Sequence, residues 1–347
     1  MFTTPAERTA WRQRIFGPLD DAAFNAAALE LFAWQFAHCK PFQLLAKARE
    51  VSPKQIKSWR DIPAVPQRLF KEATLYSHPI KTATTVFHTS GTTTGEPGKQ
   101  HLRRIDLYNA TCVEGAKRAS VLNDTQALHF LAPSPLAAPN SSLSAMFEFW
   151  REGWGNDDSQ FWVEKGHLQL ERLRRQLEQT VDPVGVCGAA FSFVHWIDTF
   201  SQADPLVLPE KSWLLETGGF KGRSREIDKA EFYEALAYLF GVKPDRIWNE
   251  YGMCELSSQA YARGPQGMHR TPPWARVLVV DPSTDREVAV GEVGLVRWID
   301  LANVDSVLAI QTLDQAVREK DGFYLIGRLS QADPRGCSLT AETFHRA

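Results

Sequence analysis

The chain has 347 residues and nearly balanced charge, with 39 Lys and Arg against 41 Asp and Glu. A net charge of −2 offers no electrostatic footprint for a nucleic-acid backbone or an anionic lipid surface. No apolar run approaches the ~18 residues that a membrane helix needs, and the N-terminus lacks the apolar stretch of a secretory signal. Hydrophobic residues make up 44 %, as in ordinary globular proteins. We therefore expect a folded cytoplasmic protein with no nucleic-acid partner and no membrane span.

The cysteines are few and far apart in the sequence. An odd, dispersed set of this kind is typical of free thiols in a reducing compartment. The sequence contains no CxxC, HxxxH or HExxH motif, so we expect no zinc site or other transition-metal site. The five are Cys39, Cys112, Cys187, Cys254 and Cys337.

The N-terminal part is predicted to begin with a helix and to reach its first strand near residue 82. Apolar residues recur at helical spacing over residues 24–34. The proline-spaced residues 61–76 read as an extended connection. Residues 82–89 are rich in β-branched and aromatic side chains and run into a Gly/Thr-rich turn. A helical stripe over residues 105–122 follows, so this turn is predicted to join a strand to a helix after a short linker.

Strands and helices alternate through the middle of the chain. A helix is predicted to start at Asp228, which has Glu231 three residues later, and to stop at Gly241. The basic residues 167–180 are predicted to form a helix that docks on the core with a solvated charged face. The other predicted segments are strands at 182–190, 212–216, 245–252, 274–282, 291–299 and 307–312, and a helix at 191–200.

This pattern predicts an α/β fold with two parts. Residues 1–273 would form an α/β core with a helical N-terminal segment. Residues 274–347 would form a smaller β-rich subdomain and a hinge-like C-terminal tail.

The turn from Ser90 to Lys99 contains the densest set of chemically useful groups. Its glycines let backbone N–H groups approach an anion, its hydroxyls can donate to phosphate oxygens, and Lys99 adds a positive charge. A plain surface turn is the alternative. It is not a Walker A loop, because Thr93 stands where that motif has glycine.

Five segments together resemble the adenylate-forming (acyl-CoA synthetase-like) superfamily. Residues 89–99, TSGTTTGEPGK, resemble its TSGTTGxPK signature with one extra Thr and a Gly before the Lys. Residues 218–221, GGFK, resemble its adenine segment, and residues 249–255, NEYGMCE, resemble its NxYGxTE motif. Asp314 lies where the ribose-binding Asp is expected, although in a TLD rather than a TGD context, and Gly327-Arg328 where the hinge GR pair is expected.

Within that superfamily the chain is most similar to the acyl-protein synthetases of the bacterial luciferase operon, the LuxE-like family. The segments GGFKGRS, NEYGMCELSSQAY and RGCSLTAE carry this likeness. Acyl-CoA synthetases continue into a large C-terminal domain with a catalytic lysine, whereas this chain ends ten residues after Cys337. The resemblance therefore implies the N-terminal-domain-like core with the large C-terminal domain absent, which argues against an ordinary CoA ligase.

The resemblance implies ATP as co-substrate, and the chemistry implies Mg²⁺. Adenylation joins two anions, so a divalent ion and a clamp of donors must offset their charge. Glu255 would be the metal ligand, and Lys99 with the turn would hold the leaving pyrophosphate. Tyr251 would face the adenine, and Asp314 and Arg328 would bind the ribose or phosphate. The expected nucleotide-binding residues are Thr89, Ser90, Gly91, Thr92, Thr93, Thr94, Gly95, Gly218, Gly219, Asn249, Glu250, Tyr251, Gly252, Asp314 and Arg328.

Cys337 is the expected acyl acceptor. It follows an Arg at position 335 and precedes a short helical-looking end, and both features favour the thiolate. In the LuxE-like family the acylated cysteine also lies near the C-terminus. A buried inert thiol is the alternative. Cys254 is expected to be a packing or phosphate-adjacent residue, and Cys39, Cys112 and Cys187 core residues.

The predicted function is activation of a carboxylic acid, in particular a fatty acid, to acyl-AMP, followed by transfer to a protein thiol as a thioester. Catalysis would depend on Cys337, Lys99 and Glu255. The acyl group would then pass to an acceptor protein such as a reductase or an acyl carrier. Two alternatives remain open: an acyl- or aryl-CoA ligase of the phenylacetate type, and an inactive homologue that binds a nucleotide or a partner.

Overall fold

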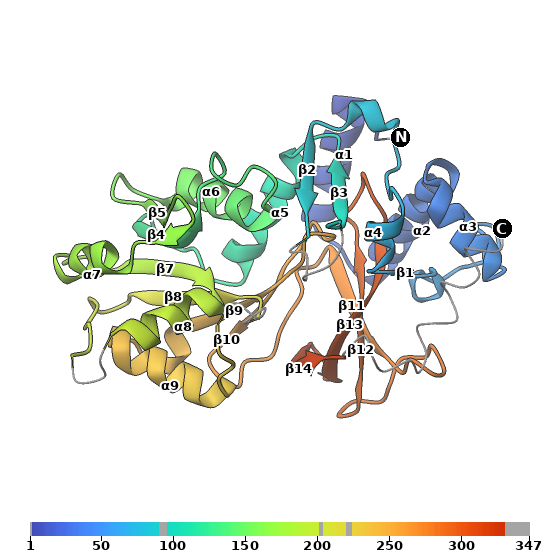
Figure 1. Ribbon diagram of the computed structural model, residues 1–347. Coiled ribbons are helices and arrows are strands. Elements are labelled where there is room, and N and C mark those ends of the chain that lie inside the picture. Colours follow the sequence, from blue (N-terminus) through green and yellow to red (C-terminus); the bar gives the residue numbers. More distant parts are fainter. Residues whose placement is uncertain (1, 90–95, 201–203, 220–223, 330–347) are drawn as a thin grey trace. The chain divides into compact units, whose positions relative to one another are not determined.

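The computed structural model describes residues 2–89, 96–200, 204–219 and 224–329 (Figure 1). The chain divides into two compact units. Unit 1 comprises Met1–Tyr108, Cys254–Ser258 and Arg270–Ala347, less the residues not described, and unit 2 comprises Asn109–Met253 and Gln259–His269. The predicted boundary between residues 273 and 274 stays a prediction.

Unit 2 is built on a seven-stranded sheet with a parallel centre. Its strand order is β10-β9-β8-β7-β4-β5-β6, and the five strands from β9 to β5 run parallel. The two edge strands, β10 and β6, pair antiparallel to their neighbours. The strands are β4 (Ala127–Pro133), β5 (Gln160–Glu164), β6 (His167–Leu168), β7 (Val184–Ala189), β8 (Trp213–Thr217), β9 (Ile247–Tyr251) and β10 (Ala260–Arg263).

Helices cover both faces of this sheet (Figure 1). On one face, a buried cluster joins the strands to three helices. It contains Leu173 and Leu177 of α7, Phe193 and Trp196 of α8 and the apolar face of α9. On the other face Phe130 of β4 stacks on Phe147 of α6 at 4.9 Å. The helices are α5 (Asp106–Arg118), α6 (Ser142–Trp154), α7 (Leu170–Glu178), α8 (Ala190–Thr199) and α9 (Lys229–Phe240), and a 3₁₀ turn spans Pro244–Arg246.

Local signals explain why α9 starts and stops where it does. The Asp228 carboxylate accepts hydrogen bonds from the backbone N–H groups of Ala230 and Glu231, so it caps the N-terminus. Gly241 ends the helix in the left-handed region, with φ 61°, where a side chain would be strained. The predicted helix is confirmed, and so is the predicted docking of α7 through buried Leu173 and Leu177.

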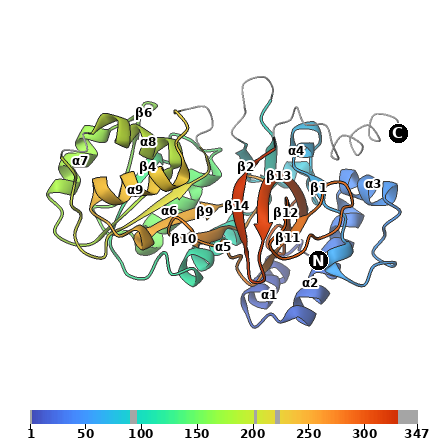
Figure 2. The same cartoon turned by 90° about the horizontal axis from the view of Figure 1, so that it is seen from below.

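Unit 1 contains a five-stranded, largely antiparallel sheet (Figure 2). Strands β11, β12 and β13 pair antiparallel. The opposite edge of β13 is shared, because β1 pairs parallel with its first part and β14 antiparallel with its second. The strands are β1 (Val65–Pro66), β11 (Ala275–Val280), β12 (Val293–Asp300), β13 (Ala309–Arg318) and β14 (Phe323–Arg328). The predicted β-rich C-terminal region is confirmed, and with unit 2 the fold class is α/β.

Residues 85–88 and 99–102 form a two-stranded antiparallel sheet in unit 1. Strand β2 (Thr85–His88) pairs with β3 (Lys99–Leu102) in the register His88 to Lys99. The sequence predicted a turn and a short linker before the next helix, and the linker is in fact a strand. Lys99, Gln100 and His101 have no strand-like pattern of their own, so the pairing with β2 determines their conformation.

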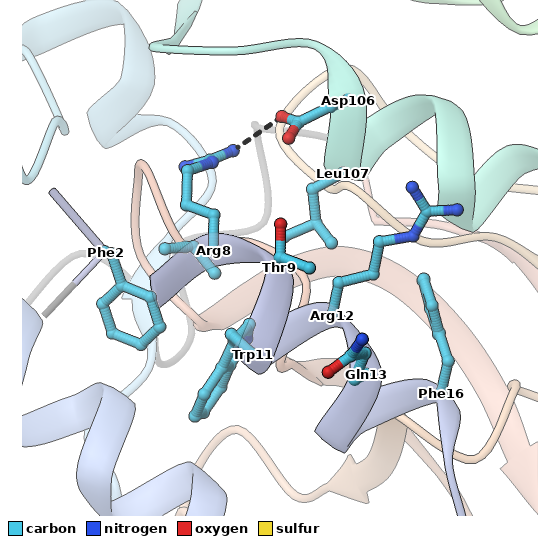
Figure 3. Close-up of a pocket in the computed structure, with 10 residues that line it drawn as sticks. Phe2, Arg8, Thr9, Trp11, Arg12, Gln13, Phe16, Asp106 and Leu107 are labelled. Carbon is cyan, nitrogen blue, oxygen red and sulfur yellow. Dashed lines mark hydrogen bonds and ion pairs between the residues drawn. The ribbon is translucent and has the colours of Figure 1, made fainter. Parts of the chain in front are cut away.

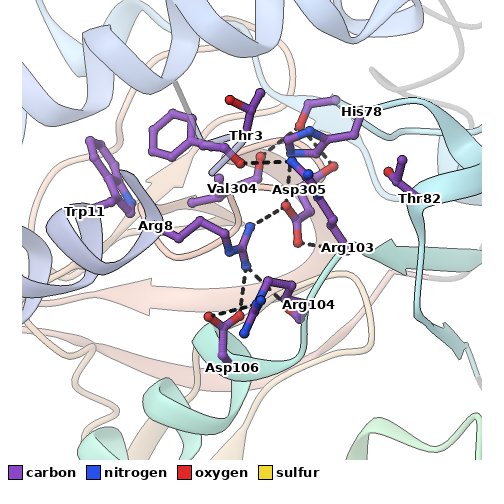
Figure 4. A network of polar contacts seen from close by, with 12 residues as sticks. Thr3, Arg8, Trp11, His78, Thr82, Arg103, Arg104, Asp106, Val304 and Asp305 are labelled. Atoms are coloured by element: carbon purple, nitrogen blue, oxygen red, sulfur yellow. Dashed lines mark hydrogen bonds and ion pairs between the residues drawn. The ribbon is translucent and has the colours of Figure 1, made fainter. Parts of the chain in front are cut away.

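The N-terminal helices of unit 1 are held by a buried polar cluster (Figure 4). The Arg8 guanidinium lies 2.7 Å from the Asp305 carboxylate and 3.2 Å from that of Asp106. Burial would raise the pKa of Asp305, but the His78 ring and Arg8 outweigh it, and the pKa is lowered. The helices of unit 1 are α1 (Pro5–Phe16), α2 (Asp21–His38), α3 (Lys40–Ala48) and α4 (Leu69–Glu72), with 3₁₀ turns at Trp59–Asp61 and Ile80–Thr82.

Candidate functional site

Part of the predicted phosphate turn can be placed in unit 1. Thr89 and Gly98 close the end of the β2–β3 sheet, because each backbone N–H donates to an oxygen of the other residue at 2.9 Å. A Cβ added at Gly98 would lie 3.3 Å from the Phe70 backbone, so only glycine fits without a shift. Lys99 begins β3, is half-exposed, and lies 3.7 Å from the Glu96 carboxylate. Ser90, Gly91, Thr92, Thr93, Thr94 and Gly95 lie outside the described residues.

Glu255 is a buried carboxylate in unit 1. Its Oε1 accepts a hydrogen bond of 3.0 Å from the Gln67 amide. Burial raises the pKa of Glu255, and the Gln67 hydrogen bond and the positive charge of Arg328 oppose that rise. Its backbone carbonyl accepts from Gln100 at 3.1 Å and from Asn303 at 2.9 Å. Side chains from two distant segments thus fix the position of this acid.

The residues after Glu255 are fixed by a second buried acid. The Asp300 carboxylate accepts from the backbone N–H groups of Ser257 and Ser258, at 3.0 and 2.9 Å, and from the Ser258 hydroxyl at 2.7 Å. Burial raises the pKa of Asp300 to about 6, although these donors oppose the rise. The short segment Cys254–Ser258 is therefore tied to the end of β12.

Asp314 and Arg328 face each other across β13 and β14 and connect to Glu255. They are register partners, and their charged groups are 3.5 Å apart. Arg328 also donates to the Gln67 Oε1 at 2.8 Å. Three residues predicted from separate motifs, Glu255, Asp314 and Arg328, are thus brought together through Gln67, which the sequence did not indicate.

The predicted adenine-side residues belong to unit 2, where β8 and β9 end next to each other. Gly218 follows β8 with φ 68°, and Gly219 is next in the chain. Thr217 of β8 is the register partner of Glu250 of β9 and donates its hydroxyl to the Glu250 carboxylate. A Cβ added at Gly252 would collide with that carboxylate and would have to displace it.

Asn249 and Tyr251 of β9 are backed by buried groups that the sequence did not indicate. The Asn249 amide donates to Glu216, and its Oδ1 contacts the ring of His269. Tyr251 and His269 meet edge to face, with ring centroids 6.1 Å apart. Burial raises the pKa of Glu216 to about 7, opposed by hydrogen bonds from Tyr233 and Asn249 and by the charge of Lys229. A lone His or Glu with no motif around it gives no signal in a sequence.

The described cysteines are all buried. Cys39, Cys112 and Cys187 are core residues, as predicted. Burial raises the pKa of the Cys254 thiol, and the neighbouring Glu255 charge adds to this. Cys254 is therefore a poor source of thiolate. Cys337 lies outside the described residues.

The donor set around Glu255 fits the magnesium that adenylation implies. Mg²⁺ uses one or two carboxylates together with substrate phosphates, and Glu255 supplies a hard oxygen. Within residues 2–89, 96–200, 204–219 and 224–329, no group of three or more His, Cys, Asp and Glu could hold a metal ion. A self-contained protein cage is thus not found among them, and the phosphates of bound ATP would have to supply the other ligands.

One cavity of unit 1 is lined by other residues. A pocket of about 380 Å³ lies beside α1 and is lined by Phe2, Arg8, Trp11 and Phe16, among others (Figure 3). It contains none of the residues predicted from the motifs. We base the candidate site on the Glu255 cluster, because cavity size alone identifies no chemistry and the cluster joins residues of three motifs.

A family model for the acyl-protein synthetases, LuxE, matches residues 160–344, just over half of the chain. The chain belongs to the LuxE acyl-protein synthetase family. This confirms the family resemblance drawn from the sequence.

Curated relatives in the LuxE family cover part of the chain. The long-chain-fatty-acid–luciferin-component ligase of Aliivibrio fischeri is 28 % identical over 198 residues, which are 52 % of this chain and 52 % of that protein. The Vibrio harveyi protein of the same name is 24 % identical over 137 residues, 37 % of this chain and 36 % of that one. The chain therefore spans about half, or less, of the curated relatives it matches.

Solved structures show that this LuxE family member has the fold of adenylate-forming ligases. 2-Hydroxyisobutyryl-CoA ligase, in complex with 2-HIB-AMP and CoA, matches with a TM-score of 0.70 and 15 % identity over 95 % of this chain and 70 % of that one. ATP-bound MatB from Rhodopseudomonas palustris matches with a TM-score of 0.51 and 13 % identity over 73 % and 49 % of the two chains. At such identities the likeness concerns the fold alone. None of the described helices has the length and hydropathy to cross a membrane.

Proposed function

We propose that this chain activates a fatty acid with ATP and passes the acyl group to a protein cysteine. The observation that carries the proposal is the cluster in unit 1, where Glu255, Asp314 and Arg328 are linked through Gln67. The motifs assign these three residues to one reaction. Residues that act on the same nucleotide and ion must lie close to one another, and these three are connected by hydrogen bonds and an ion pair. Family membership and the names of the curated relatives, long-chain-fatty-acid ligases, support the substrate class.

The first step is adenylation. A carboxylate oxygen of the acid attacks the α-phosphorus of ATP, the bond to the β-phosphate oxygen breaks, and acyl-AMP and pyrophosphate form. Lys99 and the donors of its turn would stabilise the leaving pyrophosphate. Glu255 would hold the magnesium ion, which offsets the charge of the phosphates. Asp314 would accept from the ribose hydroxyls, and Arg328 would donate to the ribose or phosphate.

The second step is transfer to a thiol. A cysteine thiolate attacks the acyl carbonyl carbon, the mixed anhydride bond breaks, and a thioester and AMP form. The four described cysteines are buried, and burial raises the pKa of Cys254 in particular. This favours Cys337 as the acceptor, because the sequence has an arginine two positions before it and predicts a short helix after it. From there the acyl group would pass to a reductase or an acyl carrier.

Two measurements test the proposal. ATP–pyrophosphate exchange should require both a fatty acid and Mg²⁺, and excess chelator should abolish it. Glu255→Gln should remove most of this exchange because it weakens the hold on the ion. Pyrophosphate exchange that persists in excess chelator would contradict the proposed role of Mg²⁺. If no acid-dependent exchange is seen at all, the result favours an inactive homologue.

Intact-mass spectrometry after incubation with ATP, Mg²⁺ and a panel of acids should show a covalent acyl adduct without CoA. Neutral hydroxylamine should remove the adduct, as expected for a thioester. If acyl-CoA forms when CoA is present and no adduct appears on the protein, the activity is that of a CoA ligase. The same panel reports the preferred acid.

A further inference from the structure

Gln67 connects the buried acid of the candidate site to its exposed cation. Its Nε2 donates to Glu255 at 3.0 Å, and its Oε1 accepts from Arg328 at 2.8 Å. Glu255 is 3 % exposed, whereas the Arg328 side chain is 54 % exposed. The amide therefore links a charge in the interior of unit 1 to one at its surface.

The chemistry of the two neighbours fixes the orientation of this amide. A guanidinium has only donors and an ionised carboxylate only acceptors, so Oε1 must face Arg328 and Nε2 must face Glu255. A neutral amide meets both requirements at once. Methionine has a similar length but neither group, and asparagine has both groups on a shorter side chain.

The backbone holds Gln67 in place. Its N–H donates to the Gln311 carbonyl at 2.9 Å, which extends the pairing of β1 with β13, and its own carbonyl accepts from Phe70 at 3.2 Å. Asp314 lies further along β13, and Arg328 lies on β14. One strand, β13, thus sets the spacing between Gln67 and the Arg328–Asp314 pair.

We propose that Gln67 is a positioning residue for divalent-ion binding at Glu255. It turns the carboxylate toward one orientation and couples that orientation to Arg328. This inference rests on the proposed function, in which Glu255 holds the ion. Removing a residue that orients a metal ligand generally lowers the metal affinity 10- to 100-fold.

The test is Mn²⁺ binding to the full chain, measured by electron paramagnetic resonance with α,β-methylene-ATP. This analogue cannot transfer its adenylyl group, because a methylene replaces the oxygen that bridges the α- and β-phosphates. We expect Gln67→Met and Gln67→Asn to weaken Mn²⁺ binding about 10-fold or more. The affinity for α,β-methylene-ATP in excess chelator should change less than the Mn²⁺ affinity, because Gln67 acts on the ion through the carboxylate. In pyrophosphate exchange, both variants should raise the Mg²⁺ concentration needed for half-maximal rate.

Gln43→Met is the matched control. Gln43 is a part-buried glutamine of unit 1 whose Nε2 donates to the Phe36 carbonyl at 3.1 Å, away from the Glu255 cluster. It should leave Mn²⁺ binding unchanged. Thermal unfolding of all variants identifies any that fold poorly, and if Gln67→Met is one of them the comparison rests on Gln67→Asn.

The outcomes separate the two proposals. Wild-type Mn²⁺ affinity in a folded Gln67→Met or Gln67→Asn protein overturns the role of Gln67 and leaves the proposed function intact. If Mn²⁺ binding depends on Gln67 but the wild-type chain shows no acid-dependent exchange, the proposed function is overturned and the positioning role is left intact. Equal weakening by Gln43→Met would show that the effect is general and would overturn the inference.

Discussion

Replacing Glu216 with glutamine should remove a pH-dependent loss of stability from unit 2. Glu216 is buried, and its pKa is raised from 4.5 to about 7 in the folded protein. The folded state therefore keeps a proton that the unfolded chain releases, so the stabilisation is complete below pH 4.5 and is lost as the pH rises through about 7. The difference corresponds to about 3 kcal/mol between the two limits.

The substitution preserves the local contacts. Glu216 Oε1 accepts from the Tyr233 hydroxyl at 2.9 Å and from the Asn249 amide, and a glutamine Oε1 can accept both bonds. Glu216→Gln should therefore have near wild-type stability at pH 5 and exceed the wild type by about 3 kcal/mol at pH 8.

Urea unfolding at pH 5 and pH 8, followed by circular dichroism, measures this difference. Glu234→Gln is the control, because Glu234 is an exposed residue of α9 and should not alter the pH dependence. If Glu216→Gln loses as much stability as the wild type between the two pH values, the proton is not held at Glu216 and the reasoning is refuted.

Three other substitutions test separate steps of the argument. Lys99→Ala should lower pyrophosphate exchange by ~10²-fold if Lys99 steadies the leaving group, and an unchanged rate would mark it as a surface residue. Gly185→Ala should destabilise the chain by about 1–3 kcal/mol in urea unfolding, because the new Cβ would lie 2.5 Å from the Trp213 ring; Gly153→Ala, with open space around it, should not. Cys337→Ser should retain exchange and lose the hydroxylamine-labile acyl label. A label that moved to Cys254 would show that the wrong cysteine had been chosen.

Much of the fold could be predicted from the sequence because its signals are local. The apolar stripe of residues 24–34 lies in α2, and Asp228 and Gly241 mark the limits of α9. The strand predicted at residues 182–190 contains β7. In each case the period, the cap or the apolar run is present in the segment itself, so no distant contact is needed to identify it.

Strand β3 was missed because it depends on a partner elsewhere in the chain. Strand β3 contains lysine, glutamine and histidine and exists because β2 supplies its hydrogen bonds. The candidate site shows the same limit. Motif spacing indicated Glu255, Asp314 and Arg328, whereas Gln67 lies in a proline-spaced segment that reads as a connection. A glutamine becomes informative only when its two neighbours are known, and these come from residues 255 and 328.

The N-terminal helices make hydrogen bonds and an ion pair with residues that are synthesised much later in translation. Trp11 donates to the Leu301 carbonyl, Gln35 to that of Asn303, and Arg8 pairs with Asp305. At 5–20 residues per second, at least about ten seconds pass between the synthesis of these helices and that of their partners. The central strands of unit 2, from β4 to β9, are completed within that interval. During translation the apolar faces of α1 and α2 therefore lack their final partners for at least this time. Apolar surface that is transiently exposed in this way is prone to aggregation.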